Sequence, residues 1–276
     1  MTLMEAVILG VIQGFTEPLP VSSSAHLVII PALIRGFTEP GVFFDVILHL
    51  GTLVGIVFFL RRDIAGLFTS LMPAQWPSGP AIAGGEERKT NRRIVLLIVV
   101  ATAVTGTIGI LFKERIESLF QSPEKTAFML LVTGLLLFLS DRIKKTDRNK
   151  SDMNLTDGII LGLVQAAALI PGISRSGSTI AFGIFRGLKR ETAARFSFLL
   201  SVPAIAGAVI LKTADLTHLP SGDLPILSAG FLSAAVTGFL ALKILFAILG
   251  RTGLGVFAYY CWFAGTAALI VLGLQP

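Results

Sequence analysis

A polar stretch interrupts the apolar N-terminal sequence at residues 16–26, which read TEPLPVSSSAH. It holds a carboxylate, Glu17, a run of serines and, one helical turn after Ser23, the imidazole of His26. A serine beside a carboxylate or an imidazole can act as a nucleophile, because either group can take its proton. We therefore interpret Ser23 as a candidate nucleophile and Glu17 or His26 as its general base. Glu17 is also a candidate metal ligand, and the alternative for it is a structural ion pair or an interfacial carboxylate.

A second polar stretch lies at residues 170–179, IPGISRSGST, and contains the guanidinium of Arg175. An arginine within a membrane helix costs from about 2.5 to more than 10 kcal/mol. Its planar fork suits phosphate oxygens, so we expect a cradle for a phosphate or diphosphate. The alternative is that Arg175 only pairs with a carboxylate and holds helices together. The hydroxyl side chains that follow Pro20 and Pro171 in the two stretches are Ser22, Ser23, Ser24, Ser174, Ser176, Ser178 and Thr179.

Each polar stretch contains a proline, Pro20 or Pro171, that is followed by serines. Proline fits the first turn of a helix and serine caps helix N-termini, so we expect a helix to restart at each place. The unpaired N–H groups and the positive dipole end of such a helix bind phosphate readily. Gln13 lies four residues before Glu17 and can share its helix face.

The composition excludes a soluble domain. The 276 residues are 53% hydrophobic and only 14% charged, and the mean hydropathy is +0.80. A soluble domain carries about 25% charged residues, so we predict an integral membrane protein. The net charge of +6 is typical of basic cytoplasmic loops. We expect no nucleic-acid partner, because no basic stripe is interleaved with aromatic residues.

Six apolar runs approach the roughly 20 residues that cross a bilayer. The segments 3–34 and 157–188 are also apolar, but proline, glycine and hydroxyl residues interrupt each at its middle. That pattern is typical of a re-entrant hairpin. The sequence predicts an all-α polytopic helical bundle, with about six transmembrane helices plus two re-entrant helical hairpins, as a single membrane domain over residues 1–276. The spans are expected near residues 42–60, 94–112, 126–140, 196–212, 224–248 and 253–274.

Basic residues are concentrated in the loops 61–93, 141–156 and 186–195. By the positive-inside rule these loops are cytoplasmic, whereas the loops 113–125 and 213–223 lie outside. This orientation places both chain termini outside. It opens the first hairpin from the outer face and the second hairpin from the cytoplasmic face.

The two hairpins are related in sequence. EAVILGVIQ (5–13) and DGIILGLVQ (157–165) share an acid, a glycine and a final glutamine in register, and each continues into a proline break. Each half of the chain then holds one hairpin and three spans, and an odd number of spans inverts the second copy. We expect inverted repeats over approximately 1–145 and 152–276, an architecture found in many transporters.

Polar residues elsewhere receive structural interpretations. Asp45 and His49 lie one turn apart early in an apolar span, and we interpret them as an interfacial or bundle-facing pair. Tyr259 and Tyr260 suit an interfacial belt or packing within the bundle.

Three segments resemble the bacterial undecaprenyl-diphosphate phosphatases of the bacitracin-resistance type. GVIQGFTEPLPVSSSAH (10–26) is similar to the first motif of that family, PGISRSGST (171–179) to its second motif, and FDVILHLGTLVGIVFFLRRD (44–63) to the span between them. The resemblance covers essentially the whole chain, in order. It implies that the catalytic residues are Glu17, Ser23, His26 and Arg175. It implies that the phosphate-contacting surroundings are Gln13, Ser22, Ser24, Ser174, Ser176 and Thr179.

The chain departs from the family pattern at three positions. Position 13 is Gln where many members have Glu, which leaves a two-carboxylate metal site open to question. Ala25 stands where glycine is common, and Pro18 stands where an aromatic residue is common. None of these departures removes a residue of the catalytic set.

The resemblance implies a hydrolase of the bacterial inner membrane that converts undecaprenyl diphosphate to undecaprenyl phosphate and inorganic phosphate. Such an enzyme recycles the lipid carrier of peptidoglycan synthesis and confers bacitracin resistance. A divalent cation (Mg or Ca) and an active site facing the periplasm or outside are expected with it. The expected partners are the polyprenyl diphosphate, the lipid bilayer and a second copy of the chain in a homodimer. The alternative is a polyprenyl-phosphate transporter or flippase on the same frame, which the inverted repeat also suits.

Overall fold

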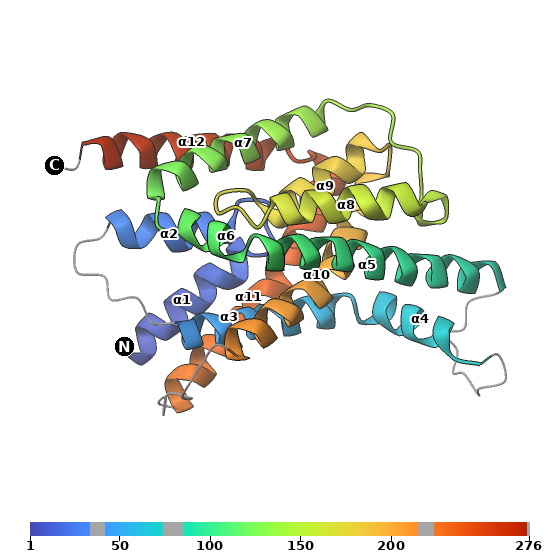
Figure 1. Ribbon diagram of the computed structural model, residues 1–276, viewed down its shortest axis with the longest axis horizontal. Coiled ribbons are helices and arrows are strands. Elements are labelled where there is room, and N and C mark those ends of the chain that lie inside the picture. The colour runs from blue at the N-terminus through green and yellow to red at the C-terminus, as the bar shows by residue number, and fades with distance from the viewer. Residues whose placement is uncertain (34–41, 74–84, 215–223, 275–276) are drawn as a thin grey trace.

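The computed structural model describes residues 1–33, 42–73, 85–214 and 224–274, and its regular structure there is helical apart from one isolated β-bridge. Most helices run roughly along the long axis of the molecule (Figure 1). The described helices are α1 (Leu3–Thr16), α2 (Ser23–Leu33), α3 (Val42–Phe59), α4 (Arg61–Leu71), α5 (Gly85–Leu111), α6 (Lys113–Leu119), α7 (Pro123–Asp141), the 3₁₀ turn η1 (Lys150–Asp152), α8 (Leu155–Ala167), α9 (Arg175–Phe185), α10 (Arg190–Ala214), α11 (Leu224–Arg251) and α12 (Gly255–Gly273).

Five described helices are long and apolar enough to cross a membrane, namely α5, α7, α10, α11 and α12. A sixth candidate span consists of α3 with α4, which are bent by 76° relative to each other. The expectation of an all-α polytopic bundle with about six spans is therefore confirmed.

The prediction of loops at residues 61–93 and 113–125 is wrong in part, because residues 61–71 form α4 and residues 113–119 form α6. The end of α4 is held against α5, where the Nε–H of Arg92 donates to the Ser70 carbonyl over 2.7 Å. Helix α5 also begins at Gly85, well before the expected start near residue 94. Glu86 and Glu87 lie in its first turn, where the positive end of the helix dipole stabilises negative side chains. The helix therefore begins in polar sequence, before its apolar part.

Each interrupted apolar segment consists of two short helices that are separated by an irregular break. The first hairpin is α1 and α2 with the break at residues 17–22, and the second is α8 and α9 with the break at residues 168–174. Both first helices begin with a capping box, whose acid is Glu5 in α1 and Asp157 in α8. These are the two acids that align in the sequence comparison of the halves.

Each hairpin packs on a helix from the other half of the chain, since α1 contacts α11 and α8 contacts α5. Both contacts are close because of glycine: a Cβ on Gly10 would lie 2.0 Å from Ser233 Oγ, and one on Gly162 would lie 2.8 Å from the Ala101 Cα. The hydroxyl of Thr237 donates to the Gly10 carbonyl over 3.4 Å, and that of Thr105 donates to the Gly162 carbonyl over 2.9 Å. Small residues of this kind let membrane helices approach each other.

The three basic loops contact one another at one end of the molecule. Arg195 pairs with Asp63 over 2.8 Å, and Arg93 Nη1 donates to the Ser151 carbonyl over 2.8 Å. The backbone N–H of Arg148 donates to the Gly187 carbonyl over 3.0 Å. The start of α1 and the end of α12 lie at the opposite end of the molecule (Figure 1). The loops that we expect on one side of the membrane are thus on one side of the fold.

The base of the second hairpin is tied to these loops through the fully buried carboxylate of Asp157. Arg148 Nη2 lies 2.6 Å from Asp157 Oδ2, and Arg186 Nε lies 2.8 Å from Asp157 Oδ1. Two guanidinium groups therefore neutralise one carboxylate, as a buried charge requires.

Candidate active site

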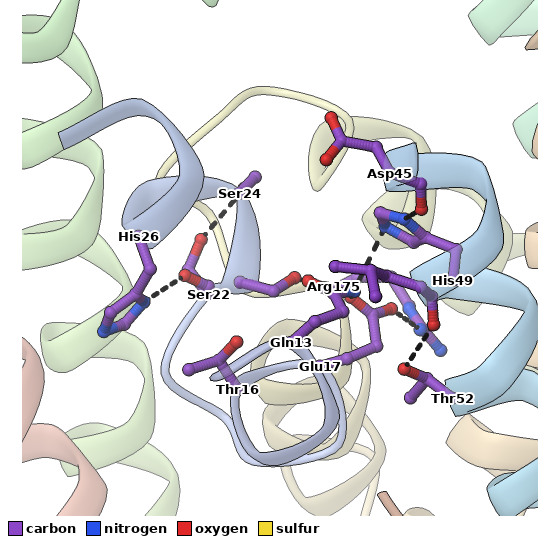
Figure 2. A network of polar contacts seen from close by, with 12 residues as sticks. Gln13, Thr16, Glu17, Ser22, Ser24, His26, Asp45, His49, Thr52 and Arg175 are labelled. Carbon is purple, nitrogen blue, oxygen red and sulfur yellow. Dashed lines mark hydrogen bonds and ion pairs between the residues drawn. The ribbon is translucent and has the colours of Figure 1, made fainter. Parts of the chain in front are cut away.

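The breaks of the two hairpins touch each other inside the protein. The Ser176 hydroxyl donates to the Leu19 carbonyl over 3.3 Å, and the Gly172 N–H donates to the Ser24 hydroxyl over 3.4 Å. The two polar stretches, about 150 residues apart in the sequence, thus form one site. Figure 2 shows the residues of the first break with Arg175 reaching in from the second.

Serines, and not prolines, begin the second helix of each hairpin. Ser22 has a φ of 63°, a strained value for a residue with a side chain, and its Oγ accepts the Ala25 N–H over 3.3 Å. Ser174 is the N-cap of α9 and accepts the Gly177 N–H over 3.1 Å. The expected restart at the prolines is corrected, because Pro20 and Pro171 lie in the turns before the helices. The N-termini of α2 and α9 nevertheless both begin at the site, which favours an anion there.

Glu17 connects the two breaks. Arg175 Nη2 lies 2.6 Å from Glu17 Oε1, and the Ser23 hydroxyl donates to Glu17 Oε2 over 2.6 Å. The amide of Gln13 donates to the same Oε2 over 3.3 Å. The ion pair that we stated as the alternative for Glu17 and Arg175 is therefore present, and the hydroxyl of the candidate nucleophile shares the same carboxylate.

Three buried atoms at this site have no hydrogen-bond partner among the described residues, namely Arg175 Nη1, Gln13 Oε1 and Ser178 Oγ. A buried donor without a partner is costly. Arg175 thus has one nitrogen on Glu17 and one nitrogen left for a ligand. The chemistry of that nitrogen fits an oxyanion such as phosphate.

The other candidate binding residues are buried except for the half-buried Ser24, but several are occupied by bonds within the protein. The Thr179 hydroxyl donates to the Arg175 carbonyl over 2.7 Å and lies 2.5 Å from Ser197 Oγ. Thr179 therefore supports the helix turn that carries Arg175. The hydroxyl oxygens of Ser174 and Ser176 lie 3.3 Å apart. Ser22 and Ser24 form a similar pair in the first break, with their hydroxyls 3.1 Å apart.

His26 does not join Ser23 and Glu17. Its Nδ1 lies 2.8 Å from the Ser22 carbonyl, and its Nε2 lies 2.7 Å from the Tyr260 hydroxyl on α12. A carbonyl only accepts, so Nδ1 carries the proton and Nε2 accepts the Tyr260 O–H. In Figure 2 the imidazole of His26 points away from Glu17.

A second histidine, His49 on α3, occupies the place that the sequence assigns to His26. His49 Nε2 lies 4.0 Å from Glu17 Oε2, and its ring faces Glu17 in Figure 2. Our structural interpretation of His49 missed this contact. The available signal was a histidine inside an apolar span, but the acidic side chain of Asp45 one turn earlier offered a local partner. In the structure, His49 Nδ1 bonds to the backbone carbonyl of Asp45.

The side chains present do not by themselves fit a divalent cation. Glu17 already accepts hydrogen bonds at both oxygens, and Gln13 offers a single amide oxygen. Mg²⁺ requires near-octahedral oxygen ligands and Ca²⁺ takes six to eight. Across the described ranges, no group of three or more His, Cys, Asp or Glu side chains could hold a metal ion.

The fold and the site define a multi-pass membrane protein in which two broken helical hairpins enclose a guanidinium, a carboxylate and a set of hydroxyls. The chain belongs to the family described as bacitracin resistance protein BacA, whose model matches residues 6–267.

Relatives in this family align over nearly the whole chain. An undecaprenyl-diphosphatase of Moorella thermoacetica is 44% identical over 261 residues, which are 94% of this chain and 94% of the relative. An undecaprenyl-diphosphatase of Methanosphaera stadtmanae is 41% identical over 272 residues, or 98% of each chain. One of Syntrophotalea carbinolica is 39% identical over 265 residues, which are 96% of this chain and 97% of the relative.

Proposed function

We propose that the protein hydrolyses undecaprenyl diphosphate to undecaprenyl phosphate and inorganic phosphate. The observation that carries the proposal is the arrangement around Glu17. One oxygen of this carboxylate holds Arg175, and the other accepts the hydroxyl of Ser23 over 2.6 Å. A site that only binds phosphate has no need of a serine hydroxyl placed against a base. The names of the relatives and the family description support the same reaction and a role in bacitracin resistance.

Substrate binding follows from the charges and the surroundings of the site. The terminal phosphate binds Arg175 Nη1 and the first N–H groups of α2 and α9, which point toward the breaks. The polyprenyl chain remains in the bilayer. A cavity of about 320 Å³ lies beside the second break, between Pro171 and the first turns of α7, and its walls are mostly apolar. This cavity supports entry of the chain from that side.

The chemistry begins with the proton of Ser23. Glu17 Oε2 takes this proton while Ser23 Oγ attacks the terminal phosphorus, and the bridging oxygen leaves with the lipid phosphate. Arg175 and the helix N-termini stabilise the charge on the phosphoryl oxygens, and each such donor is worth roughly 2.7–4 kcal/mol. A water molecule then cleaves the phosphoserine. His26 takes no part in the first proton transfer in this conformation, because both its nitrogens are occupied elsewhere.

A second version of the mechanism has no covalent step, and Glu17 activates a water molecule directly while Ser23 only binds. Mass spectrometry of a rapidly quenched reaction separates the two. The nucleophile version predicts phosphorylated Ser23 and a Ser23→Ala variant without turnover. Absence of phosphoserine together with substantial turnover of Ser23→Ala would establish the water version. Ser118→Ala on the exposed face of α6 is the matched control.

The membrane side, the cation and the assembly are further parts of the proposal. We infer that the site opens to the outer face, which the gathering of the basic loops at the other end supports. The divalent cation stays a prediction, and oxygens of the diphosphate would have to be its ligands. A homodimer in the bacterial inner membrane also stays a prediction, which the mass of the detergent-solubilised protein checks.

The deciding experiment is phosphate release from a polyprenyl diphosphate by the purified protein in detergent, with and without a chelator. We expect release by the wild type and by Ser118→Ala, and none by Glu17→Gln. A transporter or flippase on the same frame would release no phosphate from any variant. That result would refute the proposed function.

A further inference from the structure

We propose that His49 is a positioning residue of this site, which receives through Glu17 the proton that leaves Ser23. The proposal rests on the proposed function, because it concerns how the same site moves a proton. It replaces the purely structural interpretation of His49 that the sequence favours.

The orientation of the His49 ring is fixed by its own helix. Its Nδ1 lies 2.8 Å from the Asp45 carbonyl, which can only accept, so Nδ1 carries a hydrogen. The other nitrogen, Nε2, lies 4.0 Å from Glu17 Oε2 and can accept a proton when the ring is neutral. This is the oxygen that accepts the Ser23 hydroxyl over 2.6 Å. The three groups therefore form a chain in the order Ser23, Glu17, His49.

At 4.0 Å, His49 Nε2 and Glu17 Oε2 lie beyond hydrogen-bond distance, since a charged N–H···O bond is about 2.7–2.9 Å long. When Glu17 Oε2 gains a proton, it becomes a donor, and the gap can close to a hydrogen bond with Nε2.

Glu17 has a physical reason to pass this proton on. Its Oε1 neutralises Arg175 over 2.6 Å, and the two side chains are only 10% and 16% exposed. A protonated Glu17 would leave the guanidinium without its counter-ion in a poorly solvated place, which is costly. Transfer to His49 restores the carboxylate. His49 is 25% exposed, so the proton arrives at the more solvated side chain.

The site contains another histidine, but that residue cannot serve in this conformation. Both nitrogens of His26 are taken, Nδ1 by the Ser22 carbonyl and Nε2 by the Tyr260 hydroxyl. From other elements of the described structure, Glu17 after α1 faces His49, and Arg175 on α9 holds the other oxygen of Glu17.

The proton balance closes over both half-reactions. In the first, the O–H bond of Ser23 breaks and its proton passes to Glu17 and then to His49. The bond between Ser23 Oγ and phosphorus forms, and the bond to the bridging oxygen breaks with its electron pair on the lipid phosphate. In the second, water adds to phosphorus, its proton goes to Glu17 and then to the departing oxygen of Ser23. His49 returns its proton to water as inorganic phosphate leaves.

The test compares wild type, His49→Gln and His49→Ala in detergent, by kcat and KM across pH and by thermal melting. Glutamine cannot take a proton, so we expect kcat to fall about 10-fold to 100-fold with KM nearly unchanged. The pH profile of kcat should differ between the wild type and His49→Gln, because only histidine can take up a proton at this position. Imidazole in the buffer should restore part of the activity of His49→Ala.

Three results would overturn the inference. The first is a wild-type kcat and pH profile in His49→Gln. The second is a lower kcat with an unchanged pH profile and no rescue of His49→Ala by imidazole, which is the signature of a structural role. The third result counts if His49→Gln does not fold. In that case the inference fails if imidazole does not increase the activity of His49→Ala. Phosphate release by the wild type in the same assay keeps a failure of this inference distinct from a failure of the proposed function.

Discussion

Replacement of Arg175 by lysine separates the charge of the guanidinium from its shape. Arg175 uses Nη2 to hold Glu17 Oε1 over 2.6 Å, while Nη1 is buried without a partner among the described residues. Lysine presents its N–H donors from a single nitrogen, so it cannot occupy the positions of both Nη1 and Nη2. If that nitrogen stays on Glu17, the phosphate loses one charged donor. The expected loss is about 2.7–4 kcal/mol of transition-state stabilisation, or roughly 100-fold to 1,000-fold in kcat.

The Arg175→Lys variant should keep its fold, because the lysine still neutralises Glu17. The alanine variant is less informative, since an uncompensated carboxylate that is 10% exposed destabilises the protein itself, by about 3–5 kcal/mol. The assay is phosphate release in detergent, with the melting temperature measured on the same sample. Arg115→Lys on the exposed α6 is the matched control. Wild-type kcat in Arg175→Lys would refute the reasoning from two nitrogens.

Three further variants test other parts of the structure. Ser174→Ala removes the N-cap of α9, so we expect a loss of about 1 kcal/mol and a melting temperature lower by roughly 2–4 °C; an unchanged melting temperature would contradict the cap. Gly10→Ala places a Cβ 2.0 Å from Ser233 Oγ and should cost about 1–3 kcal/mol. By contrast, Gly106→Ala, which meets no atom within 4 Å, should not lower the melting temperature, and equal effects of the two would sink the packing argument. Gln13→Glu places a second carboxylate beside Glu17 and should make phosphate release depend more steeply on added Mg²⁺; a titration identical to that of the wild type would count against it.

The sequence was sufficient to locate the breaks and three side chains that the structure brings together, Glu17, Ser23 and Arg175. Prolines, serines and an arginine inside apolar runs have few physical explanations, so TEPLPVSSSAH and IPGISRSGST stand out without a structure. The contact of Arg175 with Glu17 and of Ser23 with Glu17 follows once the two breaks meet. The limits of the helices were less predictable, because α4 and the start of α5 are polar and give no apolar signal.

The partners of the two histidines could not be predicted from the sequence. Ser23 and His26 are three residues apart and suggested a pair, but the restart of α2 at Ser23 turns His26 toward Tyr260, a residue 234 positions away. His49 reaches Glu17 only through the packing of α3 against α1. Local spacing reveals neither contact, because both depend on how separate helices are placed in three dimensions.

Each hairpin packs on a helix from the other half of the chain, and this has a consequence for how the chain can be divided. The glycine face of α1 is covered by α11, and that of α8 is covered by α5. Neither half of the chain therefore encloses its own hairpin. If both halves descend from one duplicated ancestor, that ancestor was a pair of identical subunits inserted in opposite orientations, each covering the hairpin of the other. In that case, fusion of the two copies would have turned a contact between subunits into a contact within one chain, with Glu17 and Arg175 left on separate copies.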